Sequence, residues 1–254
     1  MIILHKISTF LAGIIVAVGF ALMIYFPFLS LGVIPAVLLL LFVLLARLND
    51  WQIQTYRFWN FVGTPIIFAF SGLVLFLFFE GSTEKALMGL VAAFGVFLFT
   101  EHQFAYLHTP PLYKPYSLEN LSLVLNVLTV FWLAAASYGL MIFLHVPLVL
   151  TGLAFFILNI FVVYNMLWIS KVEHSRALAY ALGGAVILTE MYLAVAYLPI
   201  SFYVSATVIS VFFYVYQGLC RAHLLDKLTK SIMLRYVTLG SGIVLLVLST
   251  AKWV

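Results

Sequence analysis

Charged residues are scarce in this sequence: they make up 8% of its 254 residues, whereas hydrophobic residues make up 66%. Soluble domains contain about a quarter charged residues and about half apolar residues. A chain with so little polar surface cannot coat a water-soluble globule, so the composition predicts an integral membrane protein without a soluble domain. The net charge of +4 is then best explained by Lys and Arg side chains facing membrane lipids, and nucleic acid is not expected as a partner.

Other absences narrow the chemistry. The single cysteine, Cys220, excludes an intrachain disulfide and a cysteine-based metal site. A Gly-rich phosphate loop, a G-x-S-x-G elbow and an HExxH motif are all missing from the sequence. We therefore expect no cofactor and no metal. The longest connections between apolar runs, 47–58, 107–117 and 221–235, are too short for a soluble domain.

What the sequence has instead is a series of long apolar runs. A membrane-spanning helix needs about 20 mainly apolar residues. Nine runs meet this requirement: 8–26, 30–46, 59–79, 86–106, 118–144, 148–169, 177–198, 201–220 and 236–252. In lipid only helices and closed barrels satisfy the backbone, and unbroken runs lack the alternation of a barrel. The predicted fold class is an all-α polytopic helix bundle with nine transmembrane helices. A weak similarity between 161–167 and 213–219 is either chance or a true repeat, and a true repeat would arrange the helices as tandem hairpins.

The distribution of Lys and Arg predicts the orientation. With the N-terminus in the cytoplasm, ten basic residues lie inside: Lys6, Arg47, Arg57, Lys114, Lys171, Arg176, Arg221, Lys227, Lys230 and Arg235. Only Lys85 and Lys252 lie outside. This bias follows the positive-inside rule. It predicts a multi-pass protein of the bacterial cytoplasmic membrane whose C-terminus lies outside the cell.

We divide the single transmembrane domain into three parts. Residues 1–58 are expected to form a peripheral helical hairpin, because they lack mid-span polar residues. Residues 59–220 form the helical-hairpin body, and 221–254 contain a basic inner loop and the last helix. Within 221–235, anionic lipid is the expected contact of the basic residues, Arg221, Lys227, Lys230 and Arg235. This segment is either a short amphipathic helix on the lipid surface or a helix extension with positive-inside charges.

Glu190 is the sharpest polar signal, since it falls near the middle of 177–198. A charged side chain at that depth costs about 2.5–3.5 kcal/mol on insertion scales. We therefore expect Glu190 to be uncharged and hydrogen-bonded to Asn159, Thr207 or Ser210 on neighbouring helices. It serves there either as a proton or cation site or as a contact that holds the bundle together.

Polar side chains also recur along single faces of the predicted helices. The stripe in 201–220 is the longest, with Tyr203, Thr207, Ser210, Tyr214, Gln217 and, just beyond the run, Arg221 at helical spacing. Such stripes either line a polar cavity or form interhelical hydrogen bonds worth about 0.6 kcal/mol each. The candidate substrate- or ion-binding residues are Glu190, Glu101, Asn126, Asn165, Tyr214 and Gln217. No catalytic residue is assigned.

Two segments, LENLSLVLNVLTVF at 118–131 and LPISFYVSATVISVFFY at 198–214, resemble uncharacterised multi-pass membrane proteins of small-genome bacterial lineages. These are known as domains of unknown function. The resemblance covers residues 60–254, and it implies no activity.

Three functions follow from these patterns. The first is transport or binding of a small solute or lipid through a polar cavity among the fourth to eighth helices. The second is an inner-leaflet enzyme acting on a lipid-linked substrate, with Glu101, His102, Glu119 and His174 as its active groups. The third is a non-catalytic scaffold subunit. The absence of long catalytic loops favours the first function, and the enzyme and the scaffold remain alternatives.

Overall fold

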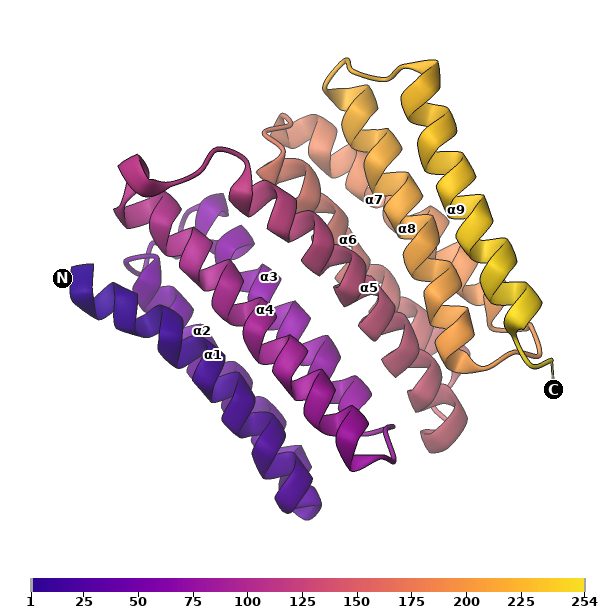
Figure 1. Ribbon diagram of the computed structural model, residues 1–254, viewed down its shortest axis with the longest axis horizontal. Helices are drawn as coiled ribbons and strands as arrows, with labels where there is room; N and C mark the ends of the chain where they lie inside the picture. The colour runs from indigo at the N-terminus through magenta and orange to yellow at the C-terminus, as the bar shows by residue number, and fades with distance from the viewer. Residues whose placement is uncertain (1, 254) are drawn as a thin grey trace. The chain divides into compact units, whose positions relative to one another are not determined.

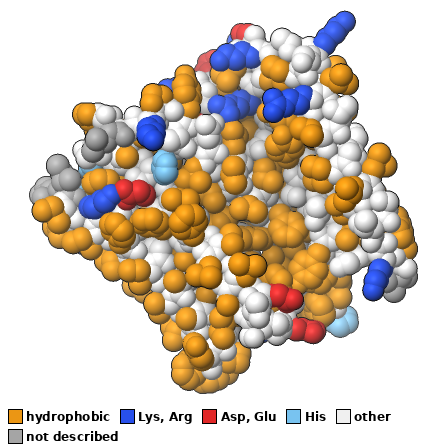
Figure 2. Space-filling model, in the orientation of Figure 1, with side chains coloured by type: hydrophobic (Ala, Val, Ile, Leu, Met, Phe, Trp, Pro, Cys, Tyr) orange, Lys and Arg blue, Asp and Glu red, His pale blue; other side chains and the backbone are white. Residues whose placement is uncertain are grey.

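The computed structural model describes residues 2–253, apart from the side chains of Ile2 and Leu112. Within this range it contains nine α-helices and two short 3-10 helices (Figure 1): α1 (Ile2–Tyr25), η1 (Pro27–Leu29), α2 (Ser30–Leu48), α3 (Tyr56–Phe76), α4 (Ser82–His108), η2 (Pro110–Leu112), α5 (Ser117–Leu144), α6 (Leu148–Ile169), α7 (His174–Val195), α8 (Phe202–Leu224) and α9 (Lys230–Thr250). Each α-helix is long and apolar enough to span a membrane. Hydrophobic side chains cover most of the face seen in Figure 2. The predicted all-α membrane fold is confirmed.

Several helices begin earlier than the apolar runs suggested, because polar residues also occupy their first turns. The clearest case is α9, which begins at Lys230 rather than at residue 236. The side chain of Thr229 caps this helix by accepting a hydrogen bond from the backbone N–H of Ile232 at 3.3 Å. Residues 230–235 are therefore the start of a spanning helix. The segment 221–235 forms the end of α8, a turn and the start of α9, and the separate amphipathic helix is wrong. The position of its charges on the inner side stays a prediction.

The chain divides into two compact units, Met1–Leu125 and Asn126–Val254. The boundary falls within α5, which begins in the first unit and continues in the second. The sequence-based division at residues 58 and 220 separates a peripheral hairpin from a central body within the membrane. The two compact units do not test that division, so it stays a prediction.

In the first unit, α1 packs along α4 as well as along its sequence neighbour α2. Two glycines on this contact face large side chains of the other helix. A Cβ atom on Gly13 would lie 2.9 Å from Cβ of Phe97, and one on Gly89 would lie 2.9 Å from Cβ of Phe20. Small residues let membrane helices approach closely. As a result the first turns of α1 lie against the last turns of α4.

In the second unit, three stacked aromatic rings join α5, α6 and α7. The ring of Tyr192 lies 4.4 Å from that of Tyr138 and 4.7 Å from that of Phe155 between centroids. The Tyr138 hydroxyl donates to the backbone carbonyl of Tyr192 at 2.8 Å, and the Tyr192 hydroxyl donates to Thr151 Oγ1 at 3.1 Å. Buried aromatic rings with satisfied hydroxyls give this region a rigid core.

Many buried hydroxyl and amide groups bond within their own helix. Thr207 donates to the carbonyl of Tyr203 at 2.8 Å, Ser210 to Thr207 at 2.9 Å, and Asn159 to Phe155 at 2.8 Å. Short polar side chains commonly satisfy themselves on a carbonyl three or four residues back. This local bonding uses the single donor proton of the Thr207 and Ser210 hydroxyls.

Candidate functional site

The turn between α8 and α9 brings basic residues of both helices together. The chain reverses at Asp226, whose φ of 54° lies in the left-handed region. The backbone N–H of Lys227 then bonds the carbonyl of Ala222 at 2.8 Å, which closes the end of α8. This closure turns Lys227 back toward the last turns of α8.

A pocket of about 370 Å³ lies between these helix ends. We call it the basic pocket; its lining residues are Tyr214, Gly218, Arg221, Ala222, Leu225, Lys227, Ile232, Arg235 and Tyr236. Among residues 2–253, no carboxylate lies within ion-pair distance of Arg221, Lys227 or Arg235. The pocket therefore combines three unneutralised cations with two tyrosine hydroxyls.

Gly218 determines the shape of the basic pocket. A Cβ atom at this position would lie 2.2 Å from the ring of Tyr236, so only glycine lets that ring pack against α8. The Tyr236 ring also contacts Tyr214, with 5.4 Å between the ring centroids. Both rings line the basic pocket together with its three cations.

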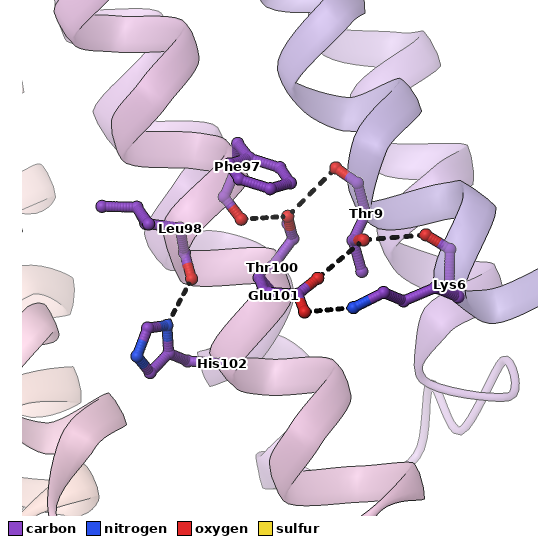
Figure 3. A network of polar contacts seen from close by, with 7 residues as sticks. All are labelled: Lys6, Thr9, Phe97, Leu98, Thr100, Glu101 and His102. Carbon is purple, nitrogen blue, oxygen red and sulfur yellow. Dashed lines mark hydrogen bonds and ion pairs between the residues drawn. The ribbon is translucent and has the colours of Figure 1, made fainter. Parts of the chain in front are cut away.

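A second polar site lies in the first unit, where α1 meets α4 (Figure 3). Lys6 of α1 forms an ion pair with Glu101 of α4. The Thr9 hydroxyl donates to the Lys6 carbonyl at 2.8 Å and lies 3.2 Å from Glu101 Oε2. The Thr100 hydroxyl donates within α4 and lies 3.3 Å from the carbonyl of Thr9. Beside this network is a groove of about 540 Å³. We call it the α1–α4 groove; its lining residues are Ile3, Lys6, Ile7, Phe10, Glu101, Phe104, Ala105 and Thr109.

Two histidines stack at the same end of the first unit. The imidazole rings of His5 and His108 are 4.4 Å apart between centroids and nearly parallel. His108 Nε2 donates to the carbonyl of Leu48 at 3.0 Å, and His5 Nε2 lies 3.5 Å from a carboxylate oxygen of Asp50. These contacts join α1, the α2–α3 turn and the end of α4.

Glu119 is held by a neutral donor rather than by a cation. The Tyr113 hydroxyl donates to Glu119 Oε2 at 2.8 Å, and Glu119 is 7% exposed. Burial, followed by the hydrogen bond to Glu119, raises the pKa of the Tyr113 phenol above its usual value. The phenol therefore remains a donor throughout the physiological range.

Glu190 does not face the neighbouring helices that the sequence suggested as its partners. Its side chain is exposed on the same face of α7 as Val186 and Ile187. Among residues 2–253 it makes no hydrogen bond or ion pair, and the predicted bonds to Asn159, Thr207 or Ser210 are wrong. The reason is that the Glu190 side chain is exposed, whereas Asn159 and Ser210 are buried.

The other candidate residues are distributed between the two units. Glu101 lines the α1–α4 groove and Tyr214 lines the basic pocket. Asn126, Asn165 and Gln217 are buried at 2%, 1% and 4% exposure. Glu101 thus belongs to the first unit and the other candidates to the second, and their binding role stays a prediction.

The groups named for an enzyme each have a partner of their own. Glu101 pairs with Lys6, and Glu119 accepts from Tyr113. His102 Nδ1 donates to the carbonyl of Leu98 at 2.8 Å, and His174 Nδ1 bonds the Tyr164 hydroxyl at 2.8 Å. In the described part of the chain, no three His, Cys, Asp or Glu side chains lie together as metal ligands would.

Sequence reasoning missed two important residues, Lys6 and Tyr236. In the sequence, Lys6 is notable only as a basic residue expected on the inner side. The one available signal is that Lys6 and Thr9 share a helical face, as two residues at one helix contact must. Tyr236 falls at the first residue of the run predicted at 236–252 and carried no motif. Neither could be assigned without knowing that α1 packs on α4 and α9 on α8.

The chain belongs to DUF5656, a family described as "protein of unknown function", whose model matches residues 6–250. No curated protein and no solved structure matches the chain. The expected relation to a family of unknown function is confirmed over a longer stretch than 60–254. Its bacterial lineage stays a prediction.

Proposed function

We propose that this multi-pass membrane protein binds a phosphate-bearing anionic lipid in the basic pocket, at the cytoplasmic face of a bacterial cell membrane. One observation supports the proposal above all: three cations from α8, α9 and their turn share one pocket without a carboxylate. Like charges held together repel, so an anion that joins them is stabilised.

The chemistry of the lining favours a phosphate group. Arg guanidinium groups match phosphate oxygens in a bidentate geometry, and Lys227 adds a compact positive charge. The tyrosine hydroxyls can donate to phosphate or glycerol oxygens. Anionic lipids concentrate in the cytoplasmic leaflet, where each nearby Lys or Arg gains about 1 kcal/mol. Of the four basic residues named from the sequence, only Lys230 is outside the pocket lining.

Solute transport is the wider hypothesis, and it has weaker support. A transport path needs polar groups that are free to exchange partners. The hydroxyls of Thr207 and Ser210 on α8 are instead bonded to their own helix. Gln217 retains a buried carbonyl oxygen without a hydrogen bond among the described residues, so it is the strongest remaining candidate for a polar path.

The test measures lipid binding by the purified chain in detergent. We expect phosphatidylglycerol to raise the thermal unfolding midpoint by roughly 2–4 °C more than phosphatidylcholine does, which corresponds to about 1 kcal/mol for a chain of this size. The double substitution Arg221→Gln and Arg235→Gln should abolish this difference. High salt should reduce it, because the interaction is between charges.

The matched control removes two positive charges elsewhere in the same unit. Lys171 lies in the α6–α7 turn and Lys230 in the first turn of α9, and neither lines the pocket. Lys171→Gln with Lys230→Gln should leave the lipid preference intact. If both double variants lose it equally, general surface charge is responsible and the pocket is not a site.

A further inference from the structure

The α1–α4 groove has the size and the walls of a lipid-binding site. Its volume of about 540 Å³ lies within the range of small-molecule pockets. Most of its lining is apolar, from Ile3, Ile7 and Phe10 on α1 to Phe104 and Ala105 on α4. Its polar groups are concentrated at the Lys6–Glu101 pair (Figure 3). An apolar groove with one charged region matches a molecule with an acyl chain and a charged headgroup.

The ion pair keeps unused bonding capacity on both partners. The Lys6 ammonium has three N–H donors, and the only acceptor found for it among the described residues is Glu101 Oε1. Glu101 Oε2 is approached by the Thr9 hydroxyl at 3.2 Å, but that hydroxyl also donates to the Lys6 carbonyl at 2.8 Å. A hydroxyl has a single proton, so the shorter bond takes it. Glu101 Oε2 is therefore left with open acceptor positions.

Both charged side chains remain accessible from the groove. The Lys6 side chain is 39% exposed and that of Glu101 is 30% exposed. The Lys6 ammonium also lies 5.2 Å from the Phe104 ring centroid and 5.6 Å from that of Phe10. Such distances allow cation–π attraction. The carboxylate and the two rings thus already surround a primary ammonium group.

The charges decide which headgroup fits. A ligand with only a phosphate would draw Lys6 away and strand the Glu101 carboxylate, which is costly near lipid. A ligand with one phosphate and one ammonium extends the pair into four alternating charges, with phosphate at Lys6 and ammonium at Glu101 Oε2. We propose that the α1–α4 groove binds phosphatidylethanolamine. Phosphatidylcholine fits less well, because its trimethylammonium group has no N–H donor for Glu101 Oε2.

This site differs in residues and in ligand charge from the basic pocket, so the two proposals can fail separately. The experiment titrates the purified chain in detergent with short-chain phosphatidylethanolamine, phosphatidylcholine and phosphatidylglycerol, and follows the thermal unfolding midpoint. For the wild type we expect an apparent affinity for phosphatidylethanolamine about tenfold higher than for phosphatidylcholine. This ratio equals the loss of one charge-assisted hydrogen bond of about 1.4 kcal/mol.

Glu101→Gln should bring this ratio close to one. Glu84→Gln is the matched control, because Glu84 is an exposed carboxylate in the first turn of the same helix. It should keep the wild-type ratio, as should Arg221→Gln with Arg235→Gln in the basic pocket.

A purely structural role for the ion pair predicts no preference among the lipids. The proposal is overturned if the wild type responds equally to phosphatidylethanolamine and phosphatidylcholine, or if folded Glu101→Gln keeps the tenfold ratio. If Glu101→Gln does not fold, Phe10→Leu decides the matter, because Phe10 is 48% exposed and the change leaves the ion pair intact. Weakening of phosphatidylethanolamine binding by a few-fold supports the groove, and unchanged binding overturns it.

Discussion

The basic pocket and the α1–α4 groove both place lysine or arginine beside an apolar surface, but they neutralise the charge differently. In the groove, Lys6 has the Glu101 carboxylate as its partner. In the pocket, Arg221, Lys227 and Arg235 have no carboxylate partner among the described residues. The difference teaches that two sites with similar residue types can differ in net charge, which is why we propose a different lipid headgroup for each.

Adding a carboxylate to the basic pocket should give its cations an internal partner, as Lys6 has in the α1–α4 groove. Ile232 lines the pocket, so Ile232→Glu places a negative charge among its three cations. We expect at least a tenfold loss of phosphatidylglycerol affinity, since the new carboxylate pairs with an arginine and repels phosphate. The titration described above measures it. Met233→Glu is the control, because Met233 is exposed and does not line the pocket; an equal loss there would contradict the prediction.

Removing the Tyr113 hydroxyl tests how the buried Glu119 carboxyl group is stabilised. Tyr113→Phe deletes the hydroxyl that donates to the buried Glu119. The free energy of unfolding should fall by about 1–2 kcal/mol, because Glu119 loses a donor at a buried position. Chemical denaturation in detergent measures the change. Tyr116→Phe, at an exposed position in the same loop, should have no comparable effect.

The same Tyr113 bond predicts a pH dependence. Burial raises the pKa of the Tyr113 phenol, so its contribution to stability is complete below about pH 10, the unfolded pKa. It is then lost as the pH rises through the higher pKa of the folded state. The difference in stability between the wild type and Tyr113→Phe should therefore narrow above pH 10. A difference that widens there would contradict the assigned bond.

The Lys6–Glu101 pair should be coupled more strongly than an exposed pair. A double-mutant cycle with Lys6→Met and Glu101→Gln is expected to give a coupling free energy of about 1 kcal/mol, at the upper end for partly exposed pairs. The comparison is Arg176 and Glu173, which are 3.8 Å apart and both 70% exposed. Their coupling should be at most about 0.5 kcal/mol. Equal coupling free energies would mean that the Lys6–Glu101 pair stabilises the contact between α1 and α4 no more than an exposed pair would.

The smallest effect is expected at Glu190. Because this carboxyl group is exposed and has no partner among the described residues, Glu190→Leu strands no donor. The free energy of unfolding should change by less than about 0.5 kcal/mol. Glu101→Leu, which strands Lys6, should cost more in the same denaturation assay. A larger loss at Glu190 would reveal a contact made outside this chain.

The sequence was sufficient for the fold because its signal was local. Twenty apolar residues predict a spanning helix wherever they occur, and all nine such helices are found in the described residues. The candidate sites were harder to predict from the sequence. Thr207 and Ser210 have the periodicity of a cavity lining, yet each bonds a carbonyl one turn earlier in its own helix. Periodicity alone cannot separate these outcomes, because both place the side chains on one face.

The partners of charged residues were equally hidden. Glu101 is a candidate site residue from the sequence, but its partner Lys6 is 95 positions earlier, in a segment predicted to be a peripheral hairpin. The two helices that carry the pair pack closely at Gly13 and Gly89. These glycines have no distinguishing sequence context, so the contact could not be inferred. The basic pocket was partly predicted, since the local charge density of 221–235 identified three of its cations.

The packing of α1 on α4 also sets an order of events during synthesis. Lys6 and Glu101 are separated by 95 positions, which ribosomes translating about 5–20 residues per second take roughly 5–20 s to cover. During that interval α1, α2 and α3 are synthesised before Lys6 can meet its partner Glu101. The first helix must therefore hold its charged end at the lipid boundary until the fourth arrives, and the groove between them is completed only after nearly half of the protein has been made.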